Sequence, residues 1–497
     1  MKSLPVLTLL FGASTVAGPA LADGGYYTGA VGPRAAGRGG AFVARADDVT
    51  AISINPAGLS EIDGTTFQVG NQFAYYGYDY TRAPTLDYGN EQNGVAPPVT
   101  FAKVRNGTPW QAALPFLGAT TRFGLRDWTF AAAVFAPPGT SREQFPEDGG
   151  QKYMMVSREA VILNTDVSAA WRFHDRFGVG LTLSWISVPR LDYSLMINAA
   201  PFQGSAYPVS SPYDVLAQTT GSDWFTFNAT VGAWVRPRPW LELALAGQVI
   251  PANIVTNSNL TLTPANPNGP LAMGLTTERQ QLPRNDVKIT LPLPLLARAG
   301  ARYRHLRGGR EVFDIELDGE YESWSRTKDF TLDTNGLSAV GGGALAGNAV
   351  PLGQIQIAKH WSDVFSVKLG GDFNLVPDRW TLRAGVYYET AVAPAAYANV
   401  DFPGAQVLGA ALGGSLILRP VEIALTYQLR YQPSFTVSEA NARFYQQVPA
   451  SPCAPPYTDP YNCNPNYLGQ PSPAVNAGTY AATSHLVALA LIYRYDR

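Results

Sequence analysis

Charged residues are scarce in this sequence of 497 residues, and long apolar runs are scarcer still. Only 15% of the residues are Asp, Glu, Lys or Arg, whereas soluble domains average roughly 25%. The formal net charge is only -2 and no basic cluster occurs, which argues against a nucleic-acid partner. After the first 22 residues no apolar run reaches about 18 residues, so membrane-spanning helices are excluded.

The first 22 residues have the pattern of a secretory signal peptide. Lys2 gives a positive start, Leu4 to Ala17 is a short apolar stretch, and Ala20 to Ala22 form a small-residue cleavage site. We therefore expect an exported protein. Only two cysteines occur, Cys453 and Cys463, and in an oxidising compartment we expect them to form a local disulfide that braces a loop.

Segments in which apolar and polar residues alternate recur from position 65 to the C-terminus. In one of them Val421, Ile423 and Leu425 share a face, and Glu422 and Thr426 lie on the other. A period of two predicts strands with one face buried. We place fourteen strands, at residues 65–80, 109–122, 127–136, 158–173, 177–194, 222–236, 240–256, 284–305, 311–328, 363–376, 379–391, 406–418, 420–436 and 479–495.

The connections between these strands alternate between short and long. The six short connections lie around Gly124, His174, Pro237, Gly308, Pro377 and Arg419, and the seven others are long. Outer-membrane barrels have tight periplasmic turns and longer external loops, whereas a soluble sandwich has no reason to keep this order. The fold class predicted is therefore an all-β, transmembrane antiparallel β-barrel of about fourteen strands. A large secreted all-β protein is the alternative on composition alone.

One predicted hairpin carries charges of opposite sign along one face of each strand. Arg298, Arg302 and Arg304 share a face of the first strand, and every second residue from Asp314 to Glu322 is acidic on the next. Arg on the lipid face costs about 2–4 kcal/mol at midplane, so both rows should face the lumen. We expect a register that pairs Arg304 with Asp314, Arg302 with Glu316 and Arg298 with Glu320. The three arginines could bind a ligand carboxylate, or the rows could form a structural ion ladder that fills the barrel or grips a plug; we favour the ladder.

Residues 23–64 differ from the strands that follow. Glycines, small residues and turn formers dominate this segment, and alternation is weak. Irregular backbone is tolerated at membrane depth only where protein or a water cavity surrounds it. We expect this segment to form a plug inside the lumen of a barrel made by residues 65–497.

Three motifs follow one another in the plug segment: Gly37-Arg38-Gly39-Gly40-Ala41, Asp47-Asp48, and Asn55-Pro56-Ala57-Gly58-Leu59. Further characteristic stretches occupy residues 291–294, 298–303, 361–363, 369–371, 382–388 and 485–495. In this order they resemble the FadL family, fourteen-stranded outer-membrane transporters of long-chain fatty acids and aromatic hydrocarbons. The resemblance spans nearly the whole mature chain and implies that the plug is the hatch of that family. We expect Asn55 and Pro56 to fix a turn of the hatch rather than to contact a ligand.

The resemblance also implies two functional features. The first mature residues, including Tyr26 and Tyr27, should reach into a hydrophobic pocket, where their rings could stack on an aromatic ligand. The third strand should be kinked so that the wall opens sideways, which on this chain falls near Pro137, Pro138 and Gly139, because proline removes ladder donors.

No sequence motif of an enzyme is present. The chain lacks Gly-x-Ser-x-Gly, His-Glu-x-x-His, a Walker loop and Cys-x-x-Cys, and its four histidines are scattered. We therefore expect no catalytic residue, cofactor or metal. The function predicted is passive transport of hydrophobic small molecules, foremost long-chain fatty acids, across the outer membrane of a Gram-negative bacterium. A general porin for polar solutes and a structural or adhesive barrel are the alternatives.

The expected partners follow from the expected compartment. We expect a monomer that contacts outer-membrane lipid and lipopolysaccharide and is inserted by the barrel-assembly machinery. Such barrels commonly end in an aromatic residue recognised by that machinery, whereas this chain ends in Tyr495-Asp496-Arg497. Tyr495 is then the residue expected to serve as the signal.

Overall fold

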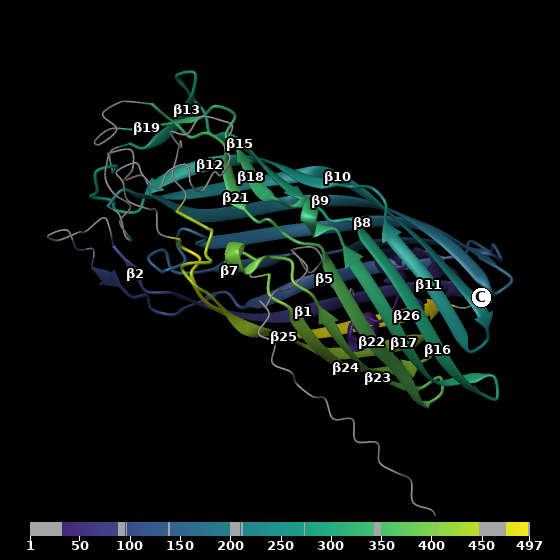
Figure 1. Cartoon of the computed structure of the whole chain (residues 1–497). Coiled ribbons are helices and arrows are strands. Elements are labelled where there is room, and N and C mark those ends of the chain that lie inside the picture. The colour runs from purple at the N-terminus through teal and green to yellow at the C-terminus, as the bar shows by residue number, and fades with distance from the viewer. Residues whose placement is uncertain are drawn as a thin grey trace, which may run out of the picture.

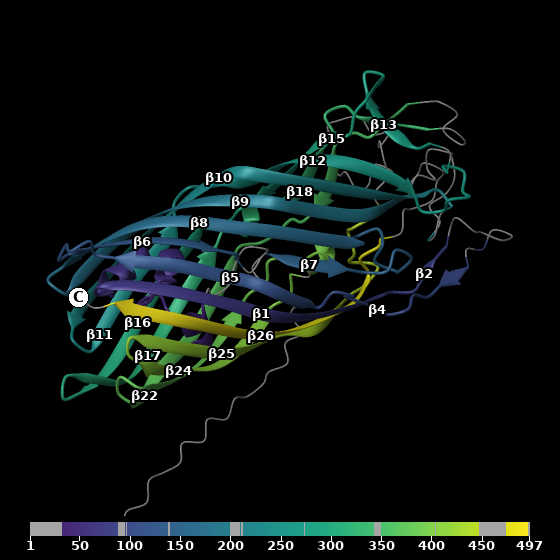
Figure 2. The ribbon, with the colours of Figure 1, turned by 180° about the vertical axis from the view of Figure 1, so that it is seen from behind.

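The chain forms a closed antiparallel β-barrel with a hatch inside it (Figures 1 and 2). A computed structural model describes residues 32–87, 95, 97–137, 140–198, 209, 212–272, 274–341, 349–402, 404–446 and 474–495. The first and last wall strands close the barrel, because Thr65 pairs with Tyr495 and the register continues to Arg82 opposite Gly478. No helix of the described residues is long and apolar enough to cross a membrane.

The wall contains fourteen strands when the segments of five interrupted strands are counted together. Nine strands are continuous: β1 (Thr65–Arg82), β5 (Trp110–Thr121), β8 (Ser157–Phe173), β9 (Phe177–Asn198), β10 (Asp214–Arg238), β23 (Trp380–Glu389), β24 (Val407–Leu418), β25 (Val421–Val437) and β26 (Gly478–Tyr495). The five interrupted strands are β6 (Trp128–Phe135) with β7 (Ser141–Gln144), β11 (Leu241–Gln248) with β12 (Asn253–Pro264), β15 (Asp286–Pro292) with β16 (Leu296–Arg307), β17 (Arg310–Glu322) with β18 (Asp329–Asp333), and β21 (Ile355–Ala358) with β22 (Val364–Val376).

Small elements lie outside this wall or beside it. They are β2 (Thr85–Leu86), β3 (Pro98–Val99), β4 (Val104–Arg105), β13 (Thr276–Arg279), β14 (Leu282–Pro283), β19 (Ser338–Val340), β20 (Val350–Pro351), and the 3-10 helices η4 (Trp324–Arg326) and η6 (Ala395–Tyr397). β13, β14, β19 and β20 form a separate four-stranded sheet at the long-loop end of the barrel (Figure 1). The short connections predicted from the sequence are confirmed as tight turns, all at the opposite end.

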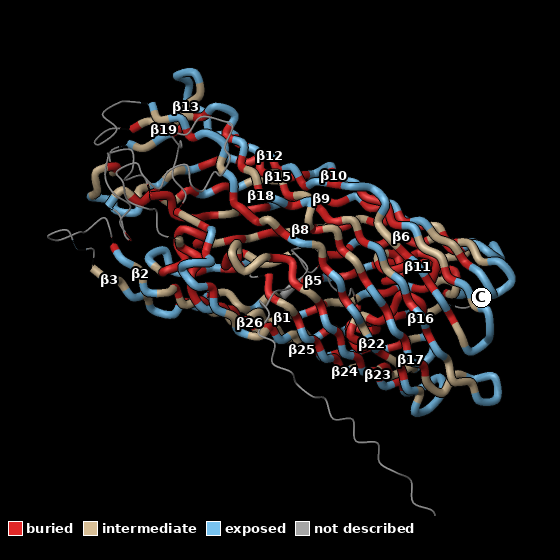
Figure 3. The backbone as a smooth tube through the Cα atoms, in the orientation of Figure 1, coloured by how far each residue is buried: buried red, intermediate tan, exposed pale blue. Residues whose placement is uncertain are grey.

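The predicted alternation places apolar side chains on the outer face of the wall. On β25, Ile423 and Leu425 are exposed, whereas Ala424 and Thr426 are buried, and Figure 3 shows the same alternation along the other strands. An exposed apolar belt is what lipid requires. Above this belt, toward the long loops, the outer face becomes polar, as with the exposed Asn259 of β12. The long-loop end of the barrel therefore extends beyond the lipid belt.

Four neighbouring wall strands are interrupted at one level, and three of them were expected to be continuous there. The expected strands 240–256, 284–305 and 311–328 break at residues 249–252, 293–295 and 323–328, and the next strand breaks at 359–363. Pro251 and Pro294 lie in two of these breaks. Proline cannot donate a ladder hydrogen bond, so the expectation of unbroken strands there was wrong for a reason visible in the sequence.

The hatch fills the lumen at the short-turn end of the barrel (Figure 2). It consists of α1 (Pro33–Gly37), α2 (Ala51–Ile54) and η1 (Pro56–Glu61), joined by turns. Its apolar residues Val49, Ile52 and Leu59 are fully buried and belong to one cluster with Phe116 and Trp234 of the wall. These side chains therefore form a hydrophobic core between the hatch and the barrel wall.

Candidate functional site

The hatch is held in the barrel by a buried arginine. Arg38 is fully buried, and its Nη1 donates hydrogen bonds to Asp314 and Asp372, each at 2.8 Å. Nη2 donates to Glu316 at 2.8 Å, and Nε donates to the Ala41 carbonyl at 2.7 Å. A guanidinium can make several such directed bonds at once, so one side chain joins the hatch to β17 and β22.

The acidic row of β17 also binds the backbone of the hatch. Asp318 Oδ2 accepts hydrogen bonds from the amides of Phe42 and Val43, at 2.7 and 2.9 Å. Glu316 Oε1 accepts a hydrogen bond from the Ala44 amide at 2.6 Å. Part of the acidic row therefore contacts the hatch rather than the facing arginine row.

The three arginines considered as ligand contacts face the lumen and are all paired with carboxylates. Their backbone register is the expected one, with Arg298, Arg302 and Arg304 opposite Glu320, Glu316 and Asp314. The Arg298 side chain meets Glu320 at 2.5 Å and donates to the hatch carbonyls of Ser53 and Ile54, at 3.1 and 3.3 Å.

The side chains of the other two arginines reach past their register partners. The Arg302 side chain bonds to Asp314, Glu242 and Glu311. The Arg304 side chain bonds to Glu311 at 2.7 Å and to Glu242 at 3.0 Å. Neither guanidinium lies in an apolar surrounding that could hold a lipid chain.

The glycines of the first hatch motif allow close approach to the wall. Gly39 and Gly40 have φ angles of +64° and +83°, in a region that residues other than glycine rarely adopt. Gly385 of β23 allows the same close approach from the side of the wall. A Cβ at this position would lie 2.1 Å from the carbonyl oxygen of Arg38. The backbones of the hatch and the wall are therefore in direct contact at this point.

The two aspartates of the second hatch motif lie in different electrostatic surroundings. Asp47 pairs with Arg34 at 2.8 Å and with Arg45 at 3.3 Å. Burial alone would raise the pKa of Asp47, but these arginines outweigh it and lower the pKa. Burial raises the pKa of Asp48, although Arg34 and a hydrogen bond from the Thr50 amide oppose it.

The third hatch motif builds a turn. Asn55 caps η1, because its Oδ1 accepts a hydrogen bond from the Ala57 amide at 3.1 Å. Its Nδ2 donates to the Val43 carbonyl at 2.8 Å. Pro56 lies against β9, where a Cβ on Gly180 would come within 2.4 Å of its carbonyl carbon. These partners belong to the hatch and the wall.

Two cavities lie on opposite sides of the hatch. The lower one opens at the short-turn end, has a volume of about 810 Å³, and is lined mainly by charged side chains such as Arg34, Arg45, Glu242 and Glu311. The upper one has a volume of about 80 Å³ and is almost wholly apolar. A hydrophobic ligand would therefore bind in the upper cavity.

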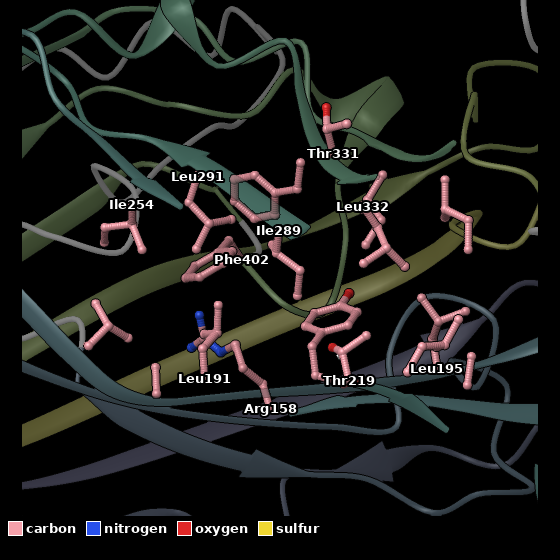
Figure 4. A pocket seen from close by; sticks show the side chains of 18 of the residues that line it. Arg158, Leu191, Leu195, Thr219, Ile254, Ile289, Leu291, Thr331, Leu332 and Phe402 are labelled. Carbon is pink, nitrogen blue, oxygen red and sulfur yellow. Dashed lines mark hydrogen bonds between the residues drawn. The ribbon is translucent and has the colours of Figure 1, made fainter. Parts of the chain in front are cut away.

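The upper cavity lies inside the barrel on the long-loop side of the hatch, among inward-facing side chains of the wall (Figure 4). Among the described residues that line it, Arg158 alone is charged. The apolar lining comes from β8, β9, β10, β12, β15, β18 and β21 and from one loop residue; it comprises Ala160, Ile162, Val188, Leu191, Leu195, Ile197, Ala217, Ile254, Leu260, Ile289, Leu291, Phe330, Leu332, Ile355, Ile357 and Phe402.

The Arg158 guanidinium is held at the edge of this cavity. Its carbon lies 3.9 Å from the centre of the Phe402 ring, and Nε and Nη2 donate to Glu143 and Ser141 at 2.8 and 2.9 Å. Figure 4 shows the guanidinium beneath that ring. Nη1 has no hydrogen bond to any described residue. One face of the cation is therefore available to a ligand.

A second buried cation lies nearby. Lys359 is ion-paired with Asp401, and its Nζ lies 4.6 Å from the centre of the Phe330 ring and 5.8 Å from that of Phe402. Tyr193, which also lines the cavity, donates its hydroxyl hydrogen bond to Asp401 at 3.3 Å. The same edge of the apolar cavity thus carries two cations and their carboxylates.

Sequence reasoning missed Arg158, although a local signal was present. Arg158 lies at the start of a predicted strand and shares its face with Ala160, Ile162 and Asp166. This pattern identifies an inward-facing cation, but it does not show which inward residues of other strands gather around it. Of the other residues considered, Pro137 lies in the break between β6 and β7, and Tyr26, Tyr27, Pro138, Gly139, Cys453 and Cys463 lie outside the described residues.

The sequence and the fold both match known transport proteins. The family described as "Outer membrane protein transport protein (OMPP1/FadL/TodX)" matches residues 14–449. No curated protein matches the chain by sequence. A FadL homologue from Pseudomonas aeruginosa superposes with a TM-score of 0.71 at 16% identity, covering 95% of this chain and 99% of that one. The toluene transporter TodX of Pseudomonas putida gives 0.58 at 12% identity, with coverages of 94% and 99%. The toluene transporter TbuX of Ralstonia pickettii gives 0.55 at 14% identity, with coverages of 94% and 98%.

Proposed function

This chain belongs to the OMPP1/FadL/TodX family of outer-membrane transport proteins, and on that premise we propose that it carries long-chain fatty acids. It is therefore an outer-membrane transporter of hydrophobic compounds and not an enzyme. The finer proposal concerns which hydrophobic compound is carried. It rests on one observation, the position of Arg158 at the edge of the apolar cavity.

A fatty acid needs an apolar surrounding for its chain and a cation for its carboxylate. Each buried methylene contributes about 0.8 kcal/mol, so even part of a long chain provides substantial binding energy. A carboxylate taken out of water must be paired with a charge or hydrogen-bonded. Arg158 is itself paired with Glu143, but its Nη1 is left for a ligand at the edge of the apolar cavity. Arg302 and Arg304 instead line the charged lower cavity, and Arg298 bonds Glu320 and the hatch. We therefore assign the ligand carboxylate to Arg158.

Binding of palmitate, hexadecanol and toluene to the purified protein in mild detergent tests this assignment. We expect Arg158→Gln to weaken palmitate binding by about tenfold to 100-fold, the range for a lost charged hydrogen bond, and to leave hexadecanol unchanged. Arg190→Gln is the matched control, because Arg190 is an exposed arginine on β9 that points to the outside. Native mass spectrometry of the protein as purified would identify the lipid that it carries.

Aromatic hydrocarbons are the second candidate class. Phe330, Phe402 and Tyr193 line the cavity, and two of the superposing structures are toluene transporters. If toluene binds tightly and Arg158→Gln changes no affinity, the aromatic class replaces the fatty acids. If neither class binds, and polar solutes diffuse through the protein in a liposome-swelling assay, the protein is a porin.

We also propose that the break in the third strand is a lateral opening. β6 and β7 are separated by residues 136–140, which include Pro137. The Thr140 hydroxyl replaces part of the ladder there, accepting from the Ile162 amide at 3.1 Å. Ile162 lines the apolar cavity, so the break lies beside that cavity. Replacing residues 137–139 with Val-Thr-Val should restore the strand, reduce fatty-acid uptake by cells and leave binding intact; unchanged uptake would contradict the proposal.

A further inference from the structure

Strand pairing along β10 is interrupted on the side that faces β11 and β12. Residues 230–235 of β10 pair with residues 243–248 of β11, and residues 215–222 pair with residues 257–264 of β12. Between these two ladders, residues 223–229 and residues 249–256 are not register partners of each other. One backbone hydrogen bond crosses the lower end of this stretch, from the Val249 amide to the Ala229 carbonyl at 2.9 Å. We call this stretch the β10 seam. Pro251 lies within it and cannot donate to a ladder.

Two side chains close the upper part of the β10 seam. Asp223 Oδ2 accepts a hydrogen bond from the Val255 amide at 2.9 Å. The Thr226 hydroxyl lies 2.7 Å from the same carboxylate and 3.0 Å from the Asn253 carbonyl oxygen. Asp223 also accepts a hydrogen bond from the Phe225 amide at 3.0 Å. The upper part of the seam is thus joined by side-chain bonds instead of backbone pairs.

The inner side of the β10 seam meets the apolar cavity. Ile254 lies between the two β12 residues bonded by Asp223 and Thr226, and Ile254 lines the cavity. Val188, another lining residue, is the register partner of Asp223 on β9. A ligand in the cavity is therefore separated from the seam by side chains alone.

The outer side of the β10 seam carries apolar side chains. Phe225 is 78% exposed, Phe227 58% and Ile250 43%. Exposed aromatic and aliphatic side chains on the outer face of a barrel contact lipid. The seam therefore lies between the apolar cavity and the membrane, and its single charged residue, Asp223, is buried.

We propose that the β10 seam is a second lateral passage, through which a hydrophobic ligand moves between the apolar cavity and the outer-leaflet lipid. This inference rests on the proposed function, but the passage is distinct from the third-strand break, because β8 and β9 lie between them. Opening it breaks the side-chain bonds of Asp223 and Thr226 and the single backbone bond between Val249 and Ala229, and it spares the two backbone ladders. The ligand would pass from the apolar cavity to the apolar outer face of the wall and would cross only the polar side chains of Asp223 and Thr226.

Locking the β10 seam tests this passage. Phe227→Cys and Ile250→Cys place thiols on its two edges in a background without the native cysteines, and a short bifunctional maleimide then joins them. The control pair is Val235→Cys with Leu243→Cys, which are register partners on the outer face of β10 and β11 below the seam. The protein is loaded with cis-parinaric acid in lipid nanodiscs, and the release of this fluorescent fatty acid into the lipid is followed in time.

We expect the seam cross-link to slow release several-fold, whereas the control cross-link leaves it unchanged. The double variant Asp223→Ala, Thr226→Val should accelerate release by about tenfold, as expected when hydrogen bonds that include a charged acceptor are lost. If cis-parinaric acid binds but its release is insensitive to both changes, the second passage is refuted and the proposed function stands. If cis-parinaric acid does not bind at all, the proposed function fails and this inference with it.

Discussion

Replacing Arg38 with methionine would test whether one buried cation keeps the barrel closed. Arg38 is the hatch residue that contacts Asp314, Glu316 and Asp372, each at 2.8 Å. Methionine fills much of the same space but leaves these carboxylates short of a cation. Removing one partner from a buried ion pair costs about 3–5 kcal/mol. Applied to hatch docking, this shifts the equilibrium roughly 100-fold to 4,000-fold toward the undocked state.

The assay is steady conductance in planar bilayers. The wild-type protein should conduct little, and Arg38→Met should show frequent large openings. The barrel wall should survive, because its backbone ladders do not involve Arg38; retained heat-modifiable migration on a gel checks this. Arg419→Met is the control, since Arg419 is a largely exposed arginine in a surface ion pair worth about 0–1 kcal/mol. A folded Arg38→Met protein that stays as closed as the wild type would refute the reasoning.

Three further predictions concern the hatch and the cysteines. The lowered pKa of Asp47 means that its stabilisation of the docked hatch is present above the ordinary carboxyl pKa and is lost only below about pH 4. Asp47 should therefore contribute no change in conductance between pH 8 and about pH 5, and an Asp47→Asn variant should remove its part of the acid response, seen by comparison of the two conductance–pH curves. Gly385→Ala should displace the hatch and raise conductance, because its Cβ would come within 2.1 Å of the Arg38 carbonyl oxygen, whereas Gly319→Ala, which has open space, should change nothing. Cys453 and Cys463 should form a disulfide that transport does not need; intact mass after alkylation with and without reduction would decide, and two free thiols would contradict it.

The hairpin of β16 and β17 shows which contacts a local sequence pattern can predict and which it cannot. The register of Arg298, Arg302 and Arg304 against the acidic strand was predicted correctly, because alternation and the turn length set it locally. The ion pairs were not all predicted. Glu316 faces Arg302 in register but bonds Arg38, which lies 278 residues earlier in the chain. Long side chains reach diagonal partners, and the hatch competes for the same carboxylates.

The sequence by itself determined the barrel, its strand number and the presence of a hatch, since each follows from a period of two, from connection lengths or from glycine-rich composition. The tertiary structure alone decided where a ligand can bind. Arg158, Phe402 and Ile289 are far apart in the chain and meet because the tilt and stagger of the strands bring their inward faces to one level. Whether these side chains reach the same level depends on the register of every strand between them. The alternation within one strand does not reveal the registers of the others.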